Sequence, residues 1–269
     1  LLLLRYQLDD TIKSQEDVEK FVHLPFLGHI PLLKEKLKDV HQKAFFVHYD
    51  PLSEVSEAFR LVKVAINFSG APGTLKCLFL TSSLPSEGKS VTITNLIASF
   101  LRDGEKVLLV DADLRHPTLH LLTNVTNVKG LSTYLASNIE FAEVLQKTVI
   151  PRLDVVPAGP LSPNPTELFG SYRMENFIRE AKSQYDRVLI DSPPITGLAD
   201  SLVIGTKVDG AILAIEARRV SRSLAKKTKQ RMLETGIKIL GVVITKIVLE
   251  RDEPSYRYYA QSYRYYGKK

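Results

Sequence analysis

The sequence has 269 residues, of which 44% are hydrophobic and 25% are charged, and its formal net charge is +6. This length can bury a full core, and the composition is that of a soluble globular protein with one or two domains. The single cysteine, Cys77, excludes a disulfide framework and any metal site built from several cysteines, and its apolar neighbours predict a buried side chain. The modest positive charge, without a long Lys/Arg run, suits an anionic membrane face and does not indicate a nucleic-acid partner.

Residues 1–50 are predicted to form a linker or arm. The four leucines at positions 1–4 are far too few to cross a bilayer, which takes about 20 apolar residues, and they fit either the start of a helix or the end of a trimmed membrane segment. Residues 9–11 and 14–17 carry turn and cap chemistry. Two X-Pro pairs within residues 24–31 favour an extended stretch there, because the residue before proline avoids the helical region.

A main domain is predicted over residues 51–250. Residues 53–68 have helical spacing, and Ser53 or Ser56 can cap the start of this helix. The expected strands cover residues 76–81, 106–110, 153–157, 187–190, 210–216 and 239–245. Helices are expected between them, notably at residues 89–102, 174–183 and 221–235.

Most of the expected strands are continuous apolar runs, which is typical of strands covered on both faces in a parallel sheet. Strands that alternate with helices predict an α/β fold with a doubly wound, mostly parallel sheet flanked by helices. The carboxyl ends of such strands meet at one edge, where ligands bind.

The loop at residues 83–90, with the sequence SLPSEGKS, lies between an expected strand and an apolar helix. Consecutive backbone N–H groups at such a turn form an anion nest, so the loop predicts phosphate binding. Lys89 would reach the outer phosphates, and the Ser90 hydroxyl would bind Mg²⁺. Serines replace the usual glycine at Ser83 and occupy the small-residue position Ser86. The residues assigned to nucleotide binding are Ser86, Glu87, Gly88, Lys89, Ser90 and Val91.

Aspartates follow two other expected strands. Asp111 and Asp113 come after the strand at 106–110, and Asp191 ends the strand at 187–190. Carboxylates there can serve a magnesium ion and its bound water, or face a nucleophile. The alternatives are a cap on the next helix for Asp111 or Asp113, or an ion pair with Arg115.

The last segment, residues 251–269, has no Val, Ile, Leu, Phe or Met, and it is predicted to be a flexible, solvent-facing tail. It holds six of the chain's 11 tyrosines: Tyr256, Tyr258, Tyr259, Tyr263, Tyr265 and Tyr266.

Four features together resemble the bacterial tyrosine autokinases of capsule and exopolysaccharide biosynthesis: the phosphate-binding loop (P-loop) at residues 83–90, the sequence DADLRHP at residues 111–117, the sequence VLIDSPP at residues 188–194, and the tyrosine cluster. These kinases belong to the deviant Walker group of P-loop NTPases. The similarity covers nearly the whole chain. It implies the cytoplasmic kinase domain of a polysaccharide co-polymerase, or chain-length regulator, with residues 1–50 as the juxtamembrane link. It also implies Mg-ATP-dependent autophosphorylation of the tail in neighbouring subunits, which would regulate polysaccharide polymerisation and export.

The resemblance implies roles for particular residues. Lys89, Asp111, Asp113 and Asp191 would be catalytic, with Asp111 as the base for the tyrosine hydroxyl. Ser90, Asp113 and Asp191 would hold Mg²⁺, and the tail tyrosines would be the acceptors. Glu57, Arg60 and Lys63 match the family's ExxRxxR oligomerisation helix with lysine in third place, although a solvated helix face with local pairs would read the same.

The same resemblance implies partners and a location. The partners are other copies in a homo-oligomeric ring, an octamer being one possible size, a membrane-embedded regulator segment that is fused or separate, and a cognate tyrosine phosphatase. The expected location is the cytoplasmic face of the bacterial inner membrane, with this fragment itself soluble.

Two other functions remain open at this point. A partition-type ATPase usually carries a signature lysine early in the P-loop, where this chain has Ser83, Leu84 and Pro85. A non-catalytic regulator would use nucleotide only to control assembly. Thr245 stands where related ATPases carry an adenine-contacting asparagine, so no base-recognition residue is assigned.

Overall fold

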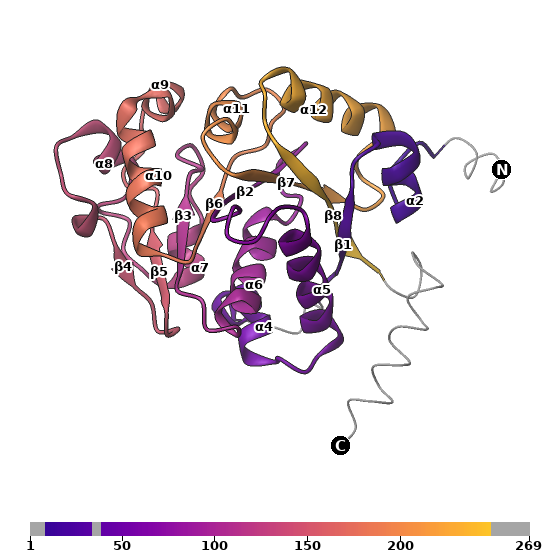
Figure 1. Ribbon diagram of the computed structural model, residues 1–269, viewed down its shortest axis with the longest axis horizontal. Helices are drawn as coiled ribbons and strands as arrows, with labels where there is room; N and C mark the ends of the chain where they lie inside the picture. The colour runs from indigo at the N-terminus through magenta and orange to yellow at the C-terminus, as the bar shows by residue number, and fades with distance from the viewer. Residues whose placement is uncertain (1–8, 34–38, 249–269) are drawn as a thin grey trace.

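An eight-stranded sheet runs through the molecule in the order β1-β8-β7-β2-β6-β3-β5-β4. The computed structural model describes residues 9–33 and 39–248 (Figure 1). The leucines at positions 1–4 and the tail tyrosines predicted as acceptors therefore lie outside the described residues. All strand pairs are parallel except that of β4 with β5, which is antiparallel. The predicted doubly wound α/β fold is confirmed.

The strands are β1 (Phe26–Pro31), β2 (Cys77–Ser82), β3 (Val107–Asp111), β4 (Gln146–Lys147), β5 (Leu153–Val156), β6 (Arg187–Asp191), β7 (Gly210–Glu216) and β8 (Ile239–Ile247). The α-helices are α2 (Gln15–Asp17), α3 (Val40–Ala44), α4 (Phe46–Tyr49), α5 (Glu54–Phe68), α6 (Lys89–Leu101), α7 (Leu119–Thr123), α8 (Leu131–Ala136), α9 (Pro165–Gly170), α10 (Tyr172–Gln184), α11 (Asp200–Gly205) and α12 (Arg222–Glu234). The described residues also contain a π-helical turn, η1 (Val18–Val22), and a 3₁₀ turn, η2 (Phe141–Glu143).

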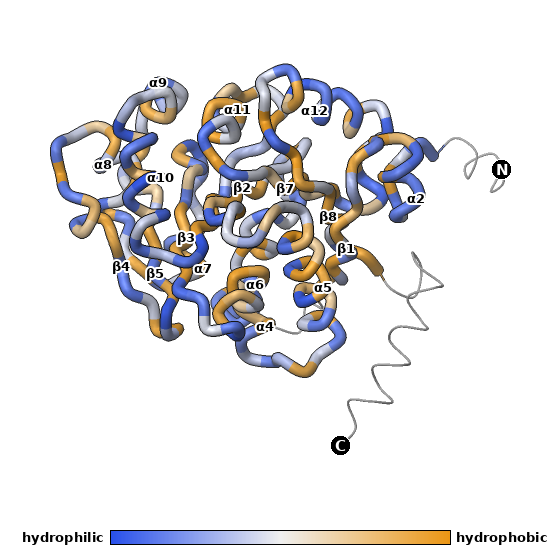
Figure 2. The backbone as a smooth tube through the Cα atoms, viewed as in Figure 1, coloured by the Kyte–Doolittle hydropathy of each residue, from blue (hydrophilic) through white to orange (hydrophobic). Residues whose placement is uncertain are grey.

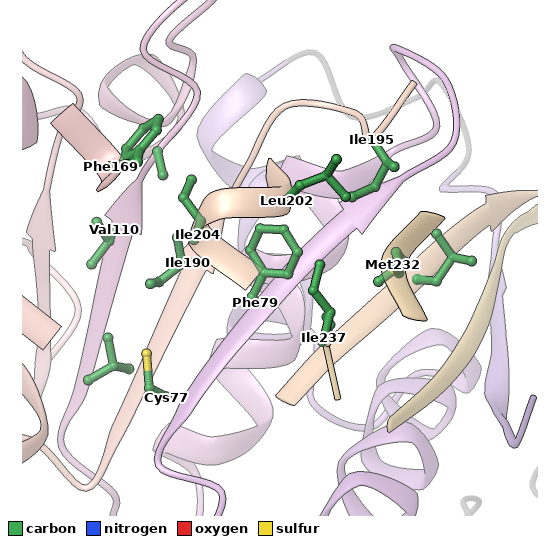
Figure 3. Close-up of a cluster of buried hydrophobic side chains, with 14 of the residues drawn as sticks. Cys77, Phe79, Val110, Phe169, Ile190, Ile195, Leu202, Ile204, Met232 and Ile237 are labelled. Carbon is green, nitrogen blue, oxygen red and sulfur yellow. The ribbon is translucent and has the colours of Figure 1, made fainter. Parts of the chain in front are cut away.

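The sheet separates two hydrophobic cores, which explains the continuous apolar strands. Alternate residues of β2 enter opposite cores, with Cys77 and Phe79 on one face and Leu78 and Leu80 on the other. The first core includes side chains of α9 to α12 (Figure 3), and the second includes side chains of α3 to α7. In Figure 2 the hydrophobic colour follows the strands, whereas much of α12 is hydrophilic. Cys77 is fully buried, as predicted, and burial raises the pKa of its thiol well above the ordinary value.

Strand β1 lies within the segment predicted to be an arm. It pairs in parallel with β8, with Phe26 opposite Val242, and it forms the edge of the sheet. Gly28 allows close packing on α5, because a Cβ there would lie 2.6 Å from Cγ2 of Val62. The prolines and this glycine conceal the strand pattern in the sequence.

The residues before β1 are fastened to α12. Thr11 bridges to Ser221, and Arg222 forms an ion pair with Asp17 at 2.8 Å. The Arg222 guanidinium also lies 3.9 Å from the centroid of the Phe21 ring, within cation–π range. Ser14 caps α2 by accepting a hydrogen bond from the backbone N–H of Asp17, as the cap chemistry predicted. Of the helices in residues 9–33 and 39–248, none is both long and apolar enough to cross a membrane.

Candidate active site

The phosphate-binding loop connects the end of β2 at Ser82 to the start of α6 at Lys89. Gly88 precedes the helix with φ +84°, a left-handed conformation that glycine adopts without a Cβ penalty. Ser86 has φ +64°, which is uncommon for a residue with a side chain. The serine that the sequence marked as a departure therefore occupies a left-handed turn within the loop.

Glu87 is a fully buried carboxylate inside this anion-binding loop. It accepts one hydrogen bond from the backbone N–H of Leu84 and another, at 2.8 Å, from that of Glu216. Burial raises the pKa of Glu87 to about 6, although these two hydrogen bonds and the nearby charge of Lys89 oppose the shift. Glu87 therefore ties the loop to the carboxyl end of β7.

Asp111 and Asp191 face each other at the ends of adjacent strands, where the register of β3 and β6 pairs them. Oδ1 of Asp111 accepts from the N–H of Asp113 at 3.1 Å, and Oδ2 accepts from the N–H groups of Thr118 and Leu119 at 3.1 and 3.0 Å. The carboxylate thus caps the start of α7, which was one of the alternatives left open by the sequence. Burial, followed by the charge of Asp191, raises the pKa of Asp111 to about 8.

Asp191 lies beside the loop hydroxyl that was predicted to bind the metal. Burial raises the pKa of Asp191 to about 6, opposed by the charge of Lys89 and a hydrogen bond from Ser90. Its Oδ1 is buried and has no hydrogen-bond partner among the described residues. An unpaired carboxylate oxygen in this position fits a hydrated cation, because the free lone pairs can accept from metal-bound water. The Thr118 hydroxyl adds a third oxygen, 3.4 Å from Oγ of Ser90.

These residues also fit the kind of cation that was expected. Within residues 9–33 and 39–248, no group of three or more His, Cys, Asp and Glu residues forms an all-protein metal cage. Mg²⁺ commonly takes only one or two protein carboxylates and fills its remaining positions with water and substrate phosphates. Ser90 and Asp191 therefore suit Mg²⁺ that arrives with a nucleotide.

Asp113 and Arg115 have separate partners in the structure. Asp113 is half-buried, and its Oδ1 accepts from the N–H of His116 at 3.0 Å. Arg115 pairs with Asp200, Nε to Oδ2 at 2.6 Å, so the alternative of an ion pair between Arg115 and the two aspartates is wrong. Asp200 lies at the start of α11 and carried no spacing signal that could have identified it.

The three residues predicted for oligomerisation do not share one set of contacts. Glu57 and Arg60 form an ion pair within α5. Lys63 is buried and donates from Nζ to Asp103 Oδ2 at 2.6 Å and to the Ser99 carbonyl at 3.3 Å. Lys63 therefore joins α5 to the end of α6, and the role of this trio in a ring remains a prediction.

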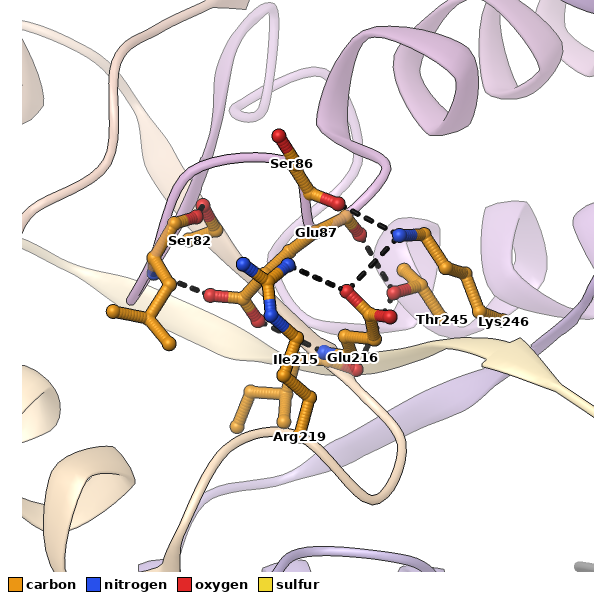
Figure 4. A network of polar contacts seen from close by, with 9 residues as sticks. Ser82, Ser86, Glu87, Ile215, Glu216, Arg219, Thr245 and Lys246 are labelled. Atoms are coloured by element: carbon orange, nitrogen blue, oxygen red, sulfur yellow. Dashed lines mark hydrogen bonds and ion pairs between the residues drawn. The ribbon is translucent and has the colours of Figure 1, made fainter.

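Residues at the ends of two further strands also contact the loop (Figure 4). That these residues lie together was not predicted from the sequence. Glu216 ends β7, and Thr245 and Lys246 lie near the end of β8. The signal for Glu216 was present, because it follows a buried strand just as Asp111 and Asp191 do. Lys246 had no such signal, since its position beside Ser86 depends on the sheet order.

Comparison with known proteins agrees with this geometry. The family model of an AAA domain matches residues 86–231, which include Lys89, Asp111, Asp113 and Asp191. The putative tyrosine-protein kinase CapB of Staphylococcus aureus is 33% identical over 80% of this chain and 95% of its own length. The tyrosine-protein kinase YwqD of Bacillus subtilis is 35% identical over 82% of this chain and 90% of its own length. The kinase domain of the Escherichia coli tyrosine kinase ETK has a similar structure, with a TM-score of 0.82 and 26% identity over 90% of this chain and 96% of that domain.

Proposed function

This chain belongs to the family of bacterial tyrosine-protein kinases, and on that basis we propose that it transfers the γ-phosphoryl group of ATP to tyrosine hydroxyls. The proposed acceptors are the six tyrosines of residues 251–269, presented to the site of a neighbouring subunit. The observation that supports this best is the meeting of a phosphate-binding loop with two buried, register-paired aspartates at one sheet edge. In a loose phosphoryl-transfer transition state, positioning and charge stabilisation of this kind supply most of the acceleration.

Each residue of the site has a proposed part. Lys89 would stabilise negative charge on the outer phosphates. Ser90 and Asp191 would hold Mg²⁺, with Asp113 contributing through water, and the bound ion would offset charge on the β- and γ-phosphate oxygens. The buried, unpaired Oδ1 of Asp191 supports its assignment to this group.

Asp111 is proposed as the general base. The tyrosine hydroxyl proton would pass to a carboxylate oxygen of Asp111 while the tyrosine oxygen bonds to the γ-phosphorus and the bond from that phosphorus to the ADP oxygen breaks. Among the described residues, Oδ1 of Asp111 accepts one backbone N–H, which leaves room for the substrate proton. Burial raises the pKa of Asp111 to about 8, so its ionised form is a stronger base than an ordinary aspartate, and the proposed Mg²⁺ nearby would favour that ionised form.

The proposed role in the cell is control of exopolysaccharide or capsule polymerisation and export. The partners would be further copies in a ring, a membrane-embedded chain-length regulator and a tyrosine phosphatase, at the cytoplasmic face of the membrane. Each added phosphate brings a charge of about −1.5 to −2, so the basic tail would become acidic and could separate the subunits by repulsion.

The test is direct. The purified chain is incubated with Mg-ATP, and phosphotyrosine is measured over time in the intact chain, in Lys89→Met and in a variant with all six tail tyrosines replaced by phenylalanine. Signal in the intact chain and loss in both variants is the expected result. Phosphotyrosine that persists in Lys89→Met would overturn the assigned site.

A matched control separates acceptor choice from general loss of tyrosine. Tyr172 is 66% exposed on α10, so Tyr172→Phe removes an accessible tyrosine outside the tail and should leave the signal unchanged. ATP hydrolysis without any phosphotyrosine would favour the partition-type ATPase instead.

A further inference from the structure

Two residues near the end of β8 hold carbonyl groups of the phosphate-binding loop. Nζ of Lys246 donates to the Ser86 carbonyl at 2.7 Å, and Oγ1 of Thr245 donates to the Glu87 carbonyl at 2.7 Å (Figure 4). These contacts join residues about 160 positions apart in the sequence. Two consecutive peptide groups of the loop are therefore fixed from the same strand.

Because of peptide geometry, these contacts also determine where two backbone N–H groups of the loop point. None of the peptide bonds in the described residues is cis, and in a planar trans peptide the C=O of one residue points opposite to the N–H of the next. A Ser86 carbonyl held by Lys246 turns the Glu87 N–H away from β8. A Glu87 carbonyl held by Thr245 does the same for the Gly88 N–H. Both are among the N–H groups that an anion nest in this loop would use.

Ser86 and Lys246, the two residues joined by this hydrogen bond, both have backbone conformations that need stabilising by neighbouring structure. Ser86 has φ +64° and Lys246 has φ +57°, and a residue with a side chain is uncommon in this left-handed region. Backbone conformations of this kind persist when neighbouring structure fixes them. The hydrogen bond from Lys246 joins the two left-handed residues directly.

Lys246 is itself held in place. Its Nζ lies 3.0 Å from Oε2 of Glu216, and the same oxygen accepts from Nη1 of Arg219 at 2.8 Å. The backbone N–H of Glu216 in turn donates to the buried Glu87 carboxylate at 2.8 Å. The end of β7 therefore holds the loop through the side chain of Glu87, and the end of β8 holds it through the carbonyls of Ser86 and Glu87.

We propose that Lys246 and Thr245 are positioning residues that preset the Glu87 and Gly88 N–H groups for the nucleotide's phosphates. This inference rests on the proposed nucleotide site but not on tyrosine transfer. It gives Thr245, which stands where related ATPases carry asparagine, a task in shaping the loop rather than in reading the base.

The experiment measures Mg-ADP affinity by titration calorimetry in the full chain and four variants. Lys246→Met and Thr245→Val each remove one donor while keeping much of the side-chain shape, and each should weaken Mg-ADP by roughly five- to twentyfold, the loss expected for one hydrogen bond. Lys246→Arg and Thr245→Ser keep a donor and should recover most of that loss. Unchanged affinity in Lys246→Met and Thr245→Val would overturn the proposal.

A second probe separates loop positioning from base recognition. Magnesium pyrophosphate carries the phosphates without the base, and its affinity, measured by competition with labelled ADP, should fall by the same factor as that of Mg-ADP. A loss confined to Mg-ADP would assign Lys246 and Thr245 to the base or sugar and overturn the proposal.

Two controls complete the design. Lys227→Met removes a cation on the exposed side of α12 and should leave both affinities unchanged, so an equal loss there would assign the effect of Lys246 to general charge. If the melting temperature of Lys246→Met falls so far that the variant is unfolded in the assay, the effect of Lys246 would be assigned to stability. If the intact chain fails to bind Mg-ADP, both the proposed function and this inference fail, whereas absent phosphotyrosine with intact ADP binding would affect only the function.

Discussion

At the scale of single residues, the site is defined by three buried carboxylates. Glu87, Asp111 and Asp191 are each at most 2% exposed. Their surroundings differ: Glu87 and Asp111 have both oxygens hydrogen-bonded, whereas Oδ1 of Asp191 has no partner in the part of the chain that the structure describes. This difference supports the proposed role of Asp191 in holding Mg²⁺.

Replacing Asp191 with asparagine should separate activity from stability. The Asp191→Asn change keeps the size of the side chain but removes a buried charge that faces Asp111, so the protein without nucleotide should be at least as stable as before. The rate of phosphotyrosine formation should fall by about 100-fold or more, because charge stabilisation at the phosphates is lost. The paired measurements are a kinetic phosphotyrosine assay and thermal unfolding without nucleotide. Activity within a factor of two of the original would contradict the metal-holding role.

The chemistry of the site was predictable from sequence to the extent that it follows strand ends. Lys89, Asp111, Asp113 and Asp191 all lie at the carboxyl edge of the sheet, as βα alternation requires. The partner of Arg115 was not predictable, because Asp200 reaches it from a helix 85 residues away. Lys246 was missed for a similar reason, since its neighbour Ser86 becomes visible only when β8 is placed beside β7.

At the scale of elements, the segment predicted as an arm contributes a strand to the kinase sheet. Strand β1 pairs with β8 and packs against helix α5, and the preceding residues lie against α12. All six strands expected from apolar runs are present within two residues of their predicted ends. The two missed strands, β1 and β4, are the outer strands of the sheet: β1 is only partly buried and contains Gly28 and Pro31, and β4 has two residues, neither of them buried, so neither forms a continuous apolar run.

Gly28→Ala tests whether β1 is an integral part of the fold. The new methyl group would meet Cγ2 of Val62 at 2.6 Å, and φ at this position is +151°, so the variant should lose about 2–3 kcal/mol of unfolding free energy. Adding Val62→Ala should recover roughly 1 kcal/mol relative to the sum of the single changes, because it removes the clash. The measurement is a double-mutant cycle by chemical denaturation.

Gly170→Ala provides the matched control for this cycle, because no atom lies within 4 Å of an added Cβ there. It should change stability by no more than about 0.5 kcal/mol. If Gly28→Ala behaves like Gly170→Ala, β1 does not pack against α5 in solution as it does in the structure.

At the scale of the whole molecule, the sheet supports two cores but gathers negative charge at one edge. The two cores give the fold its stability, whereas the buried carboxylates oppose it whenever they are ionised. Burial raises the pKa of Glu87 and Asp191 to about 6, and burial with the charge of Asp191 raises that of Asp111 to about 8. The three groups of the proposed nucleotide site are therefore also the groups that oppose stability when they are ionised.

This linkage predicts an inverse dependence of stability on pH without nucleotide. The folded chain binds protons at these sites more tightly than the unfolded chain does, so their favourable contribution is complete below about pH 4. It should be lost as pH rises through about 6 for Glu87 and Asp191 and through about 8 for Asp111, by a few kcal/mol for each group. Thermal unfolding from pH 5 to pH 8.5 with EDTA, and again with Mg-ADP, measures the effect.

Saturating Mg-ADP should flatten this slope, because the bound cation stabilises the ionised carboxylates. Asp191→Asn should flatten it in part even with EDTA, because one of the titrating groups is gone. A melting temperature that rises with pH over this range in the presence of EDTA would show that the three carboxylates are not buried as described.

Because the thiol of Cys77 is buried, a fluorescent label can be attached at a single chosen position of this protein. It is the only cysteine of the chain, it is fully buried in the central strand β2, and burial holds its pKa far above neutral, so thiol reagents should pass it by while the protein is folded. A second cysteine introduced at an exposed position, such as Ser137→Cys, would then carry a fluorophore at one defined place without any background substitution. The proposed assembly of subunits could then be tested by fluorescence with no other change in the sequence.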